Sequence, residues 1–220
     1  MVYTVLVWNL LAAVANVTAV RYLLPYLEKT SNENKAEQSV TPFKLFVTTS
    51  VIVALCSITV PVLMPDMSAF SVFKIGVSFG VLSVTFVTDY LYFRIPNILP
   101  TILAISRVLC LIPEIIIYQS GALDGMFRSL LVAIGILILL LTVRLISKDG
   151  LGYGDIKLIT ALAFLCGFRA GIFTLLLSSM ACAVVSVTLL FRRKKTLKDT
   201  LPLGPFLLIG FALTVILGIG

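Results

Sequence analysis

Two aspartates at the ends of apolar segments are the residues of this chain best placed for acid–base chemistry. Asp89 ends one apolar run in the stretch VTDYLYFRIPN, and Asp155 opens another in the stretch GYGDIKL. If the two segments pack together, their carboxyls meet and share one proton, because both cannot easily ionise at close range. One carboxylate then acts as a base on water while the other donates a proton to a substrate carbonyl. The pair predicts the chemistry of aspartyl proteases, which needs neither histidine nor metal.

Structural explanations for the same two residues remain open at this point. Asp155 is also placed to cap its helix. Asp89 is placed to balance the charge of Arg94 or Lys157, since ion-pair networks put carboxylates in similar positions.

Glycines beside Asp155 favour the chemical interpretation. Gly152 and Gly154 flank Tyr153, so the backbone there is free to adopt positive φ values and to approach another chain closely. Irregular backbone at membrane depth is tolerated only where it is buried in protein or lines a wet cavity. We therefore expect this stretch to leave room for a substrate backbone. A tight turn with a small-residue helix contact is the alternative.

The composition defines the kind of element that must position these residues. The chain has 220 residues, of which 60% are hydrophobic and 12% charged, with a mean hydropathy of +1.12. This composition predicts an all-α, polytopic transmembrane helical bundle. Histidine is absent, and the four cysteines are isolated within apolar runs, so we expect no metal site and no cofactor.

About eight segments are apolar enough to cross a bilayer, which requires about 20 residues each. The sixth is short, and the first is expected to be a retained span rather than a cleaved signal peptide, because no basic residue precedes it. The expected spans are 2–24, 43–64, 70–91, 98–118, 128–147, 156–167, 170–191 and 201–219.

The basic residues indicate how these spans are oriented. Thirteen lie in one alternating set of loops and three in the other, which places the first set in the cytoplasm and both termini outside. Asp89 and Asp155 then lie at the cytoplasmic border. The cluster FRRKK at 191–195 is interpreted as a topology anchor rather than a nucleic-acid site. Arg107 and Glu114 lie seven residues apart on one helix face, where they are placed to pair directly or through other helices, and a structural role is favoured.

Three motifs in order resemble the type IV prepilin peptidases, which are membrane aspartyl proteases of the GxGD type. The first is D-x5-IPN, from Asp89 to Pro96 and Asn97, and the second is G-x-G-D-x-K-L, from Gly152 to Leu158. The third is LPLGPFLLIG at 201–210, which is similar to the signature that opens the last helix of that family. The resemblance covers roughly residues 70–220.

The resemblance implies a six-span GxGD peptidase core at 70–220, preceded by two spans and a short cytoplasmic loop at 1–69. It implies that Asp89 and Asp155 are the catalytic pair. The implied substrates are prepilin-like precursors, cut at the cytoplasmic face of the inner membrane between a basic leader and an apolar helix. Residues expected to bind substrate or shape the site are Gly152, Tyr153, Gly154, Lys157, Arg94, Pro96, Asn97, Gly204 and Pro205.

Larger members of that family carry two C-x-x-C pairs in a loop associated with N-methylation. The corresponding loop here, 25–41, has no cysteine, so we expect peptidase activity alone. Helix direction suggests Asp155 as the base, because it starts a helix, and Asp89 as the acid, because it ends one. A presenilin-like or signal-peptide-peptidase-like GxGD protease and, less favoured, an ion-coupled transporter are the alternatives.

Overall fold

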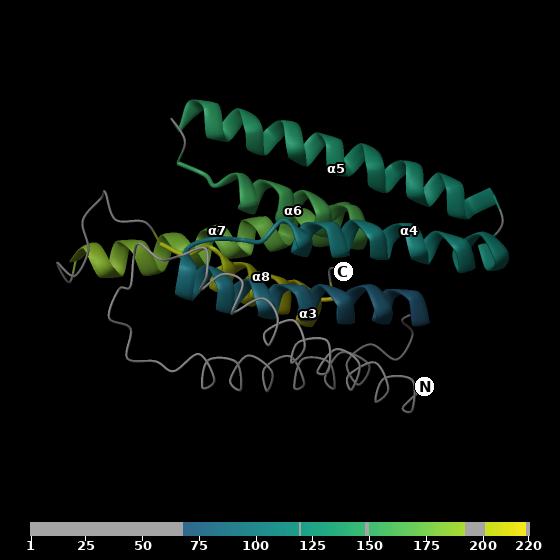
Figure 1. The fold of residues 1–220 in the computed structure, drawn as a ribbon, viewed down its shortest axis with the longest axis horizontal. Coiled ribbons are helices and arrows are strands. Elements are labelled where there is room, and N and C mark those ends of the chain that lie inside the picture. The colour runs from purple at the N-terminus through teal and green to yellow at the C-terminus, as the bar shows by residue number, and fades with distance from the viewer. Residues whose placement is uncertain (1–67, 119, 148–149, 192–200, 219–220) are drawn as a thin grey trace.

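The computed structural model describes residues 68–118, 120–147, 150–191 and 201–218, and every regular element within them is an α-helix. The predicted all-α class therefore holds for this part of the chain. The expected spans 2–24 and 43–64, the loop 25–41 and most of the cluster 191–195 lie outside the described residues. The helices, labelled as in Figure 1, are α3 (Ala69–Tyr92), α4 (Ile98–Tyr118), α5 (Ser120–Ile146), α6 (Tyr153–Cys166), α7 (Phe168–Phe191) and α8 (Gly204–Ile216).

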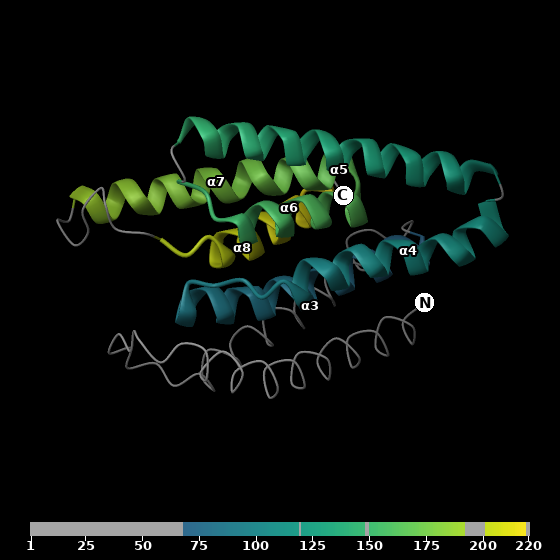
Figure 2. The ribbon, with the colours of Figure 1, turned by 45° about the horizontal axis from the view of Figure 1, so that its top comes forward.

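Successive helices run in opposite directions along one long axis (Figures 1 and 2). As a consequence, α3, α5 and α7 end where α4, α6 and α8 begin, at the left-hand end of Figure 1. The opposite end holds the start of α3, the end of α4 and the start of α5. The alternation brings residues that are far apart in sequence to the same end of the bundle.

The short helix α6 lies inside the bundle. Helices α3, α4, α5 and α7 all pack against it, and most of its apolar side chains are fully buried, including Ile156, Leu158 and Leu162. Its 14 residues span only about 21 Å, which is less than a bilayer core needs. Neighbouring helices therefore surround this short segment over much of its surface.

Small residues allow the helices beside α6 to approach closely. A Cβ on Gly171 would lie 2.5 Å from Ala163 Cβ, and one on Gly210 would lie 2.7 Å from the Ser178 backbone nitrogen. Glycine at these positions brings α6, α7 and α8 into contact, as small residues do in membrane helix pairs. On the outer surface of α4, α5 and α7, large apolar side chains are exposed, as expected for lipid contact.

Four described helices are long and apolar enough to cross a membrane. The observed ends of α5 and of the shorter α8 correct two predictions. The predicted span 128–147 begins too late, because α5 already starts at Ser120. Good helix formers such as Ala122 and Leu123 continue the helix there, and Asp124 stays exposed. The predicted span 201–219 is too long, because α8 covers only Gly204–Ile216. Pro205 occupies the first turn of α8, where proline is favoured.

Candidate active site

Asp89 and Asp155 lie at the end of the bundle where α3 ends and α6 and α8 begin. Asp89 is in the last turn of α3, and its carbonyl accepts the backbone N–H of Phe93, which caps the helix at φ 51°. Asp155 is the third residue of α6. Helix α3 packs against both α6 and α8. The antiparallel order of the helices therefore supplies the juxtaposition that the two aspartates require.

The carboxyl of Asp89 is buried, with only 7% of the residue exposed. The backbone N–H of Gly204, the first residue of α8, donates to Asp89 Oδ2 over 2.7 Å. A hydrogen bond from the amino end of a helix stabilises a negative charge through both the donor and the helix dipole. Asp89 therefore lies in the last turn of α3, while its carboxyl is hydrogen-bonded to the first residue of α8.

The carboxyl of Asp155 lies in a different environment. Its Oδ1 atom is buried and has no hydrogen-bond partner within the described part of the chain. Burial first, and the negative charge of Asp89 second, raise the pKa of this carboxyl to about 7, although a hydrogen bond with the Gly152 backbone acts in the opposite direction. The two carboxyls are therefore electrostatically coupled.

These two environments bear on which aspartate is the base. Helix direction alone suggested Asp155 as base and Asp89 as acid. The Gly204 N–H stabilises the charged form of Asp89, whereas Asp155 accepts a proton near neutral pH. The contact with the amino end of α8 thus removes the basis on which helix direction alone made Asp89 the acid.

The glycines contribute close approach rather than positive φ. Gly152 is the N-cap of α6 with φ −68°, and Gly154 is helical, so neither glycine uses the positive φ values open to it. A Cβ on Gly152 would lie 2.8 Å from Asp155 Oδ2, and one on Gly154 would lie 3.0 Å from Ile95 Cβ. A Cβ on Gly204 would lie 3.0 Å from Asp89 Cβ. All three glycines let backbone pack directly against the carboxyls or the IPN turn.

Arg144 is a residue of this region that the sequence did not reveal. It lies in the last turn of α5, with its guanidinium 3.7 Å from the centre of the Tyr153 ring. Its Nη1 atom also donates to the carbonyl oxygen of Leu151. Arg144 therefore holds both sides of Gly152, in the turn that delivers Asp155. The sequence marked it only as a basic residue of a cytoplasmic loop.

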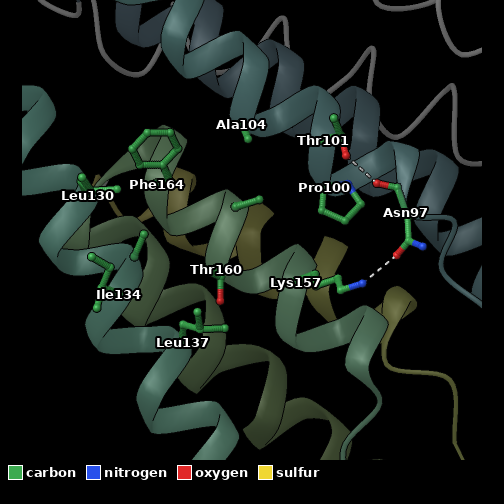
Figure 3. Close-up of a pocket in the computed structure, with 12 residues that line it drawn as sticks. Asn97, Pro100, Thr101, Ala104, Leu130, Ile134, Leu137, Lys157, Thr160 and Phe164 are labelled. Carbon is green, nitrogen blue, oxygen red and sulfur yellow. Dashed lines mark hydrogen bonds between the residues drawn. The ribbon is translucent and has the colours of Figure 1, made fainter.

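Lys157 and Asn97 lie on another side of α6, in a groove of about 520 Å³ between α4, α5 and α6 (Figure 3). Lys157 Nζ donates to Asn97 Oδ1 over 3.1 Å. Lys157 follows Asp155 by two positions, which is about 200° around a helix, so the two side chains leave α6 in nearly opposite directions. The groove and the carboxyls are therefore on different faces of α6.

The other predicted site residues lie in the turns around the two carboxyls. Arg94 is exposed, and Pro96 is half-buried in the connection between α3 and α4. Pro205 is half-buried beside the buried Gly204 at the start of α8. The Arg107–Glu114 pair lies elsewhere, toward the other end of the bundle. There Arg107 Nη1 and Glu114 Oε2 are 2.7 Å apart, as the prediction of a structural pair requires.

Comparison with known proteins identifies a family whose sequences this chain resembles. A family model described as the type IV leader peptidase family matches residues 76–187, just over half of the chain. Leader peptidase HopD of Escherichia coli is 48% identical over 64 residues, which cover 27% of this chain and 39% of that protein.

Prepilin leader peptidase/N-methyltransferase of Pseudomonas putida is 41% identical over 72 residues, which cover 33% of this chain and 25% of that protein. The matched part therefore spans less than two-fifths of the length of either relative. No solved structure matches the chain significantly.

Proposed function

The chain belongs to the type IV leader peptidase family, and from this premise we propose that it is an aspartic endopeptidase whose catalytic pair is Asp89 and Asp155. The observation that carries the proposal is the placement of the two aspartates where α3 ends and α6 and α8 begin, with the Gly204 N–H donating to Asp89 and Asp155 Oδ1 without a partner among the described residues. Neighbouring like charges without a compensating cation are costly for stability. An arrangement of this kind is expected where the charges perform chemistry.

In the proposed reaction, Asp89 is the base and Asp155 is the acid. The Asp89 carboxylate, held by the Gly204 N–H, removes a proton from water as the water oxygen attacks the scissile carbonyl carbon. Protonated Asp155 donates its proton to the carbonyl oxygen. Collapse of the tetrahedral intermediate then breaks the C–N bond: the proton taken up by Asp89 passes to the leaving nitrogen, and a hydroxyl of the intermediate returns a proton to Asp155 as the new carboxylic acid forms. Asp155 Oδ1 has no partner among the described residues, so its hydrogen-bonding capacity is not used by them.

The proposed substrates are prepilin-like precursors with a basic leader followed by an apolar helix. The names of the relatives support this substrate class, since both are called leader peptidases. The basic residues of the sequence support cleavage at the cytoplasmic face, because the loop topology expected from the sequence puts thirteen of them on the side of Asp89 and Asp155. We place the chain in the inner membrane with both termini external and with residues 70–220 as the peptidase core.

We further propose that the chain lacks N-methyltransferase activity. The Pseudomonas putida relative carries both activities in its name. The loop 25–41 of this chain contains no cysteine, whereas the methylating members that it resembles carry two C-x-x-C pairs there. The rival interpretation as a presenilin-like protease loses its support, because the family model matches the leader peptidases.

Cleavage of a prepilin-like peptide by purified protein tests the proposal. Asp89→Asn and Asp155→Asn are each expected to lower the cleavage rate by at least about a thousandfold, because the two carboxyls act as one unit. Asp124→Asn, which changes an exposed carboxyl on α5, is the matched control and should leave the rate unchanged. Near-normal cleavage by either site variant would exclude the pair, and ion flux without cleavage would indicate a transporter.

The pH dependence tests the assignment of acid and base. Asp155 must be protonated to act as the acid, and its pKa is raised to about 7. Cleavage is therefore expected to fall as the pH rises through about 7 and Asp155 loses its proton. A cleavage rate that instead rises as the pH passes through about 7 would indicate that Asp89 is the acid.

A further inference from the structure

A polar cavity of about 360 Å³ lies at the end of the bundle opposite the aspartates. Lys74 is fifteen residues before Asp89 on α3, a separation of about 22 Å along the helix. The cavity is formed by the first turns of α3, the middle and end of α4 and the first half of α5. Its lining includes Ser71, Lys74, Arg107, Glu114, Gly125 and Ser129.

Positive charge is in excess among the described residues of this cavity. Glu114 accepts from Lys74 Nζ over 2.6 Å and from Arg107 Nη1 over 2.7 Å, so one carboxylate lies between two cations. Asp124, an acidic residue near the start of α5, is exposed and is not among the described lining residues. The lining therefore carries a net charge of +1 from these three groups.

Arg107 has a donor that the described protein does not satisfy. Its side chain is only 3% exposed, and its Nε atom is buried without a hydrogen-bond partner in the described part of the chain. Leaving a charged donor buried and unpaired costs free energy. The Nε atom itself is shielded from the cavity, so a negative charge there would act on the guanidinium as a whole, and it would balance the second cation.

The cavity walls are suited to an oxyanion. The first turns of α3 and α5 both reach it, through Ser68 and Ser71 on one side and Gly121 and Ala122 on the other. Helix amino ends favour anions, particularly phosphate groups. A Cβ on Gly121 or Gly125 would meet nothing within 4 Å, so backbone rather than side chain borders the open space. The volume equals that of roughly a dozen water molecules, which accommodates more than a simple ion.

We infer that this cavity binds a phosphate-type oxyanion, carried by a phospholipid headgroup or free in solution. Arginine and lysine are the side chains that most often bind phosphate, and two helix amino ends supply further positive potential. The cavity lies at the end of helices long enough to cross a bilayer, where phospholipid headgroups are abundant. This inference does not depend on the peptidase activity, because none of its residues belongs to the aspartate site.

Thermal unfolding of the delipidated full chain in dodecyl maltoside, titrated with inorganic phosphate at constant ionic strength, tests the inference. Phosphate should raise the melting temperature in a saturable manner, because it binds the folded state. Lys74→Gln should weaken this effect about tenfold, since one charged hydrogen bond is lost while Arg107 keeps Glu114 paired. Arg128→Gln removes the same charge from an exposed position outside the cavity and should leave the effect unchanged.

A steric variant makes the test independent of charge. Gly125→Leu keeps both cations, and leucine favours the helix more than glycine does. Its side chain should occupy the cavity and abolish the phosphate effect without unfolding the protein. Persistent stabilisation of Gly125→Leu, equal behaviour of Lys74→Gln and Arg128→Gln, or no response of the wild-type protein to either phosphate source would overturn the inference.

Short-chain lipid distinguishes the two sources of phosphate. If the natural ligand is a headgroup, monomeric dihexanoyl-phosphatidylglycerol should stabilise the protein at a lower concentration than inorganic phosphate. If the ligand is free phosphate, the order should be reversed. In both cases Gly125→Leu should remove the response, and Asp89→Asn should retain it.

Discussion

The two ends of the bundle handle buried charge in opposite ways. At one end, Asp89 and Asp155 bring two carboxyls together, and the described polar partner of Asp89 is a backbone amide. At the other end, Glu114 is held between Lys74 and Arg107 by two ion pairs shorter than 3 Å. The first arrangement leaves charge available for reaction, whereas the second neutralises most of it within the protein.

This difference separates a site built for chemistry from one built for cohesion. Coupled carboxyls raise the free energy of the folded state when both are ionised, so the surrounding fold must compensate for them. Opposite charges on α3 and α4 instead tie two helices together, because removal of one partner leaves an uncompensated buried charge. Substitutions of the same kind at the two ends should therefore have opposite effects on stability.

The largest expected effect is the loss of stability in Glu114→Gln. This change leaves Lys74 and Arg107 facing each other without a carboxylate, which should lower the free energy of unfolding by about 3–5 kcal/mol. Thermal unfolding in detergent at pH 8 measures the loss.

Asp155→Asn is the matched change at the other end of the bundle. It removes a like charge from Asp89, so at pH 8 its melting temperature should equal or exceed that of the wild type. The pKa of Asp155 is raised on folding, so ionisation costs stability as the pH rises from about 4 to 7, and Asp155→Asn removes that cost. If Glu114→Gln and Asp155→Asn lowered the melting temperature equally, the proposed difference between the two ends of the bundle would be wrong.

A second prediction concerns the contact between α8 and Asp89. In Gly204→Ala the new Cβ would lie 3.0 Å from both Asp89 Cβ and the Thr85 carbonyl oxygen. Asp89 must shift away from its backbone donor, and a displacement of this size near reacting atoms is expected to lower the cleavage rate about a hundredfold. Rates of peptide cleavage at saturating substrate measure the effect.

Gly80→Ala on α3 is its control, because a Cβ there meets nothing within 4 Å. This variant should cleave at the wild-type rate. A normal rate in Gly204→Ala would mean that Asp89 does not depend on the amino end of α8.

The sequence predicted the aspartate end better than the opposite end, for a physical reason. Few ionisable residues lie in apolar segments, so Asp89 and Asp155 stood out, and alternating helix direction placed them on one side. The glycines were identified as important, but their conformation was not, because close packing and positive φ both select glycine. The donor from Gly204 is a backbone amide, which leaves no side-chain signal to detect.

At the opposite end, sequence spacing identified only part of the cluster. Arg107 and Glu114 share a helix, so their pairing followed from the seven-residue separation. Lys74 lies on α3, and its contact with Glu114 spans 40 residues, which only the packing of α3 on α4 determines. Helix ends were predictable where a local residue marks them. Pro205 marked the start of α8, whereas α5 began earlier than its hydropathy indicated.

Arg144 provides the smallest of the three predicted effects and the sharpest test of how the aspartate end is organised. It holds Leu151 and Tyr153 on either side of Gly152, in the turn that precedes Asp155. It is therefore a positioning residue for Asp155. Arg144→Ala should lower the maximal cleavage rate about tenfold, which corresponds to the loss of one charged hydrogen bond and a cation–π contact.

The pH profile separates positioning from a general loss of stability. A loosened turn admits water to Asp155, so its pKa should fall from about 7 toward the ordinary value of 3.8. The decline of activity with rising pH should then begin at lower pH in Arg144→Ala. Arg144→Lys keeps the charge but not the planar group over the Tyr153 ring, so it should restore the profile only in part. A lower rate with an unchanged profile would instead show that Arg144 stabilises α5 without setting the environment of Asp155.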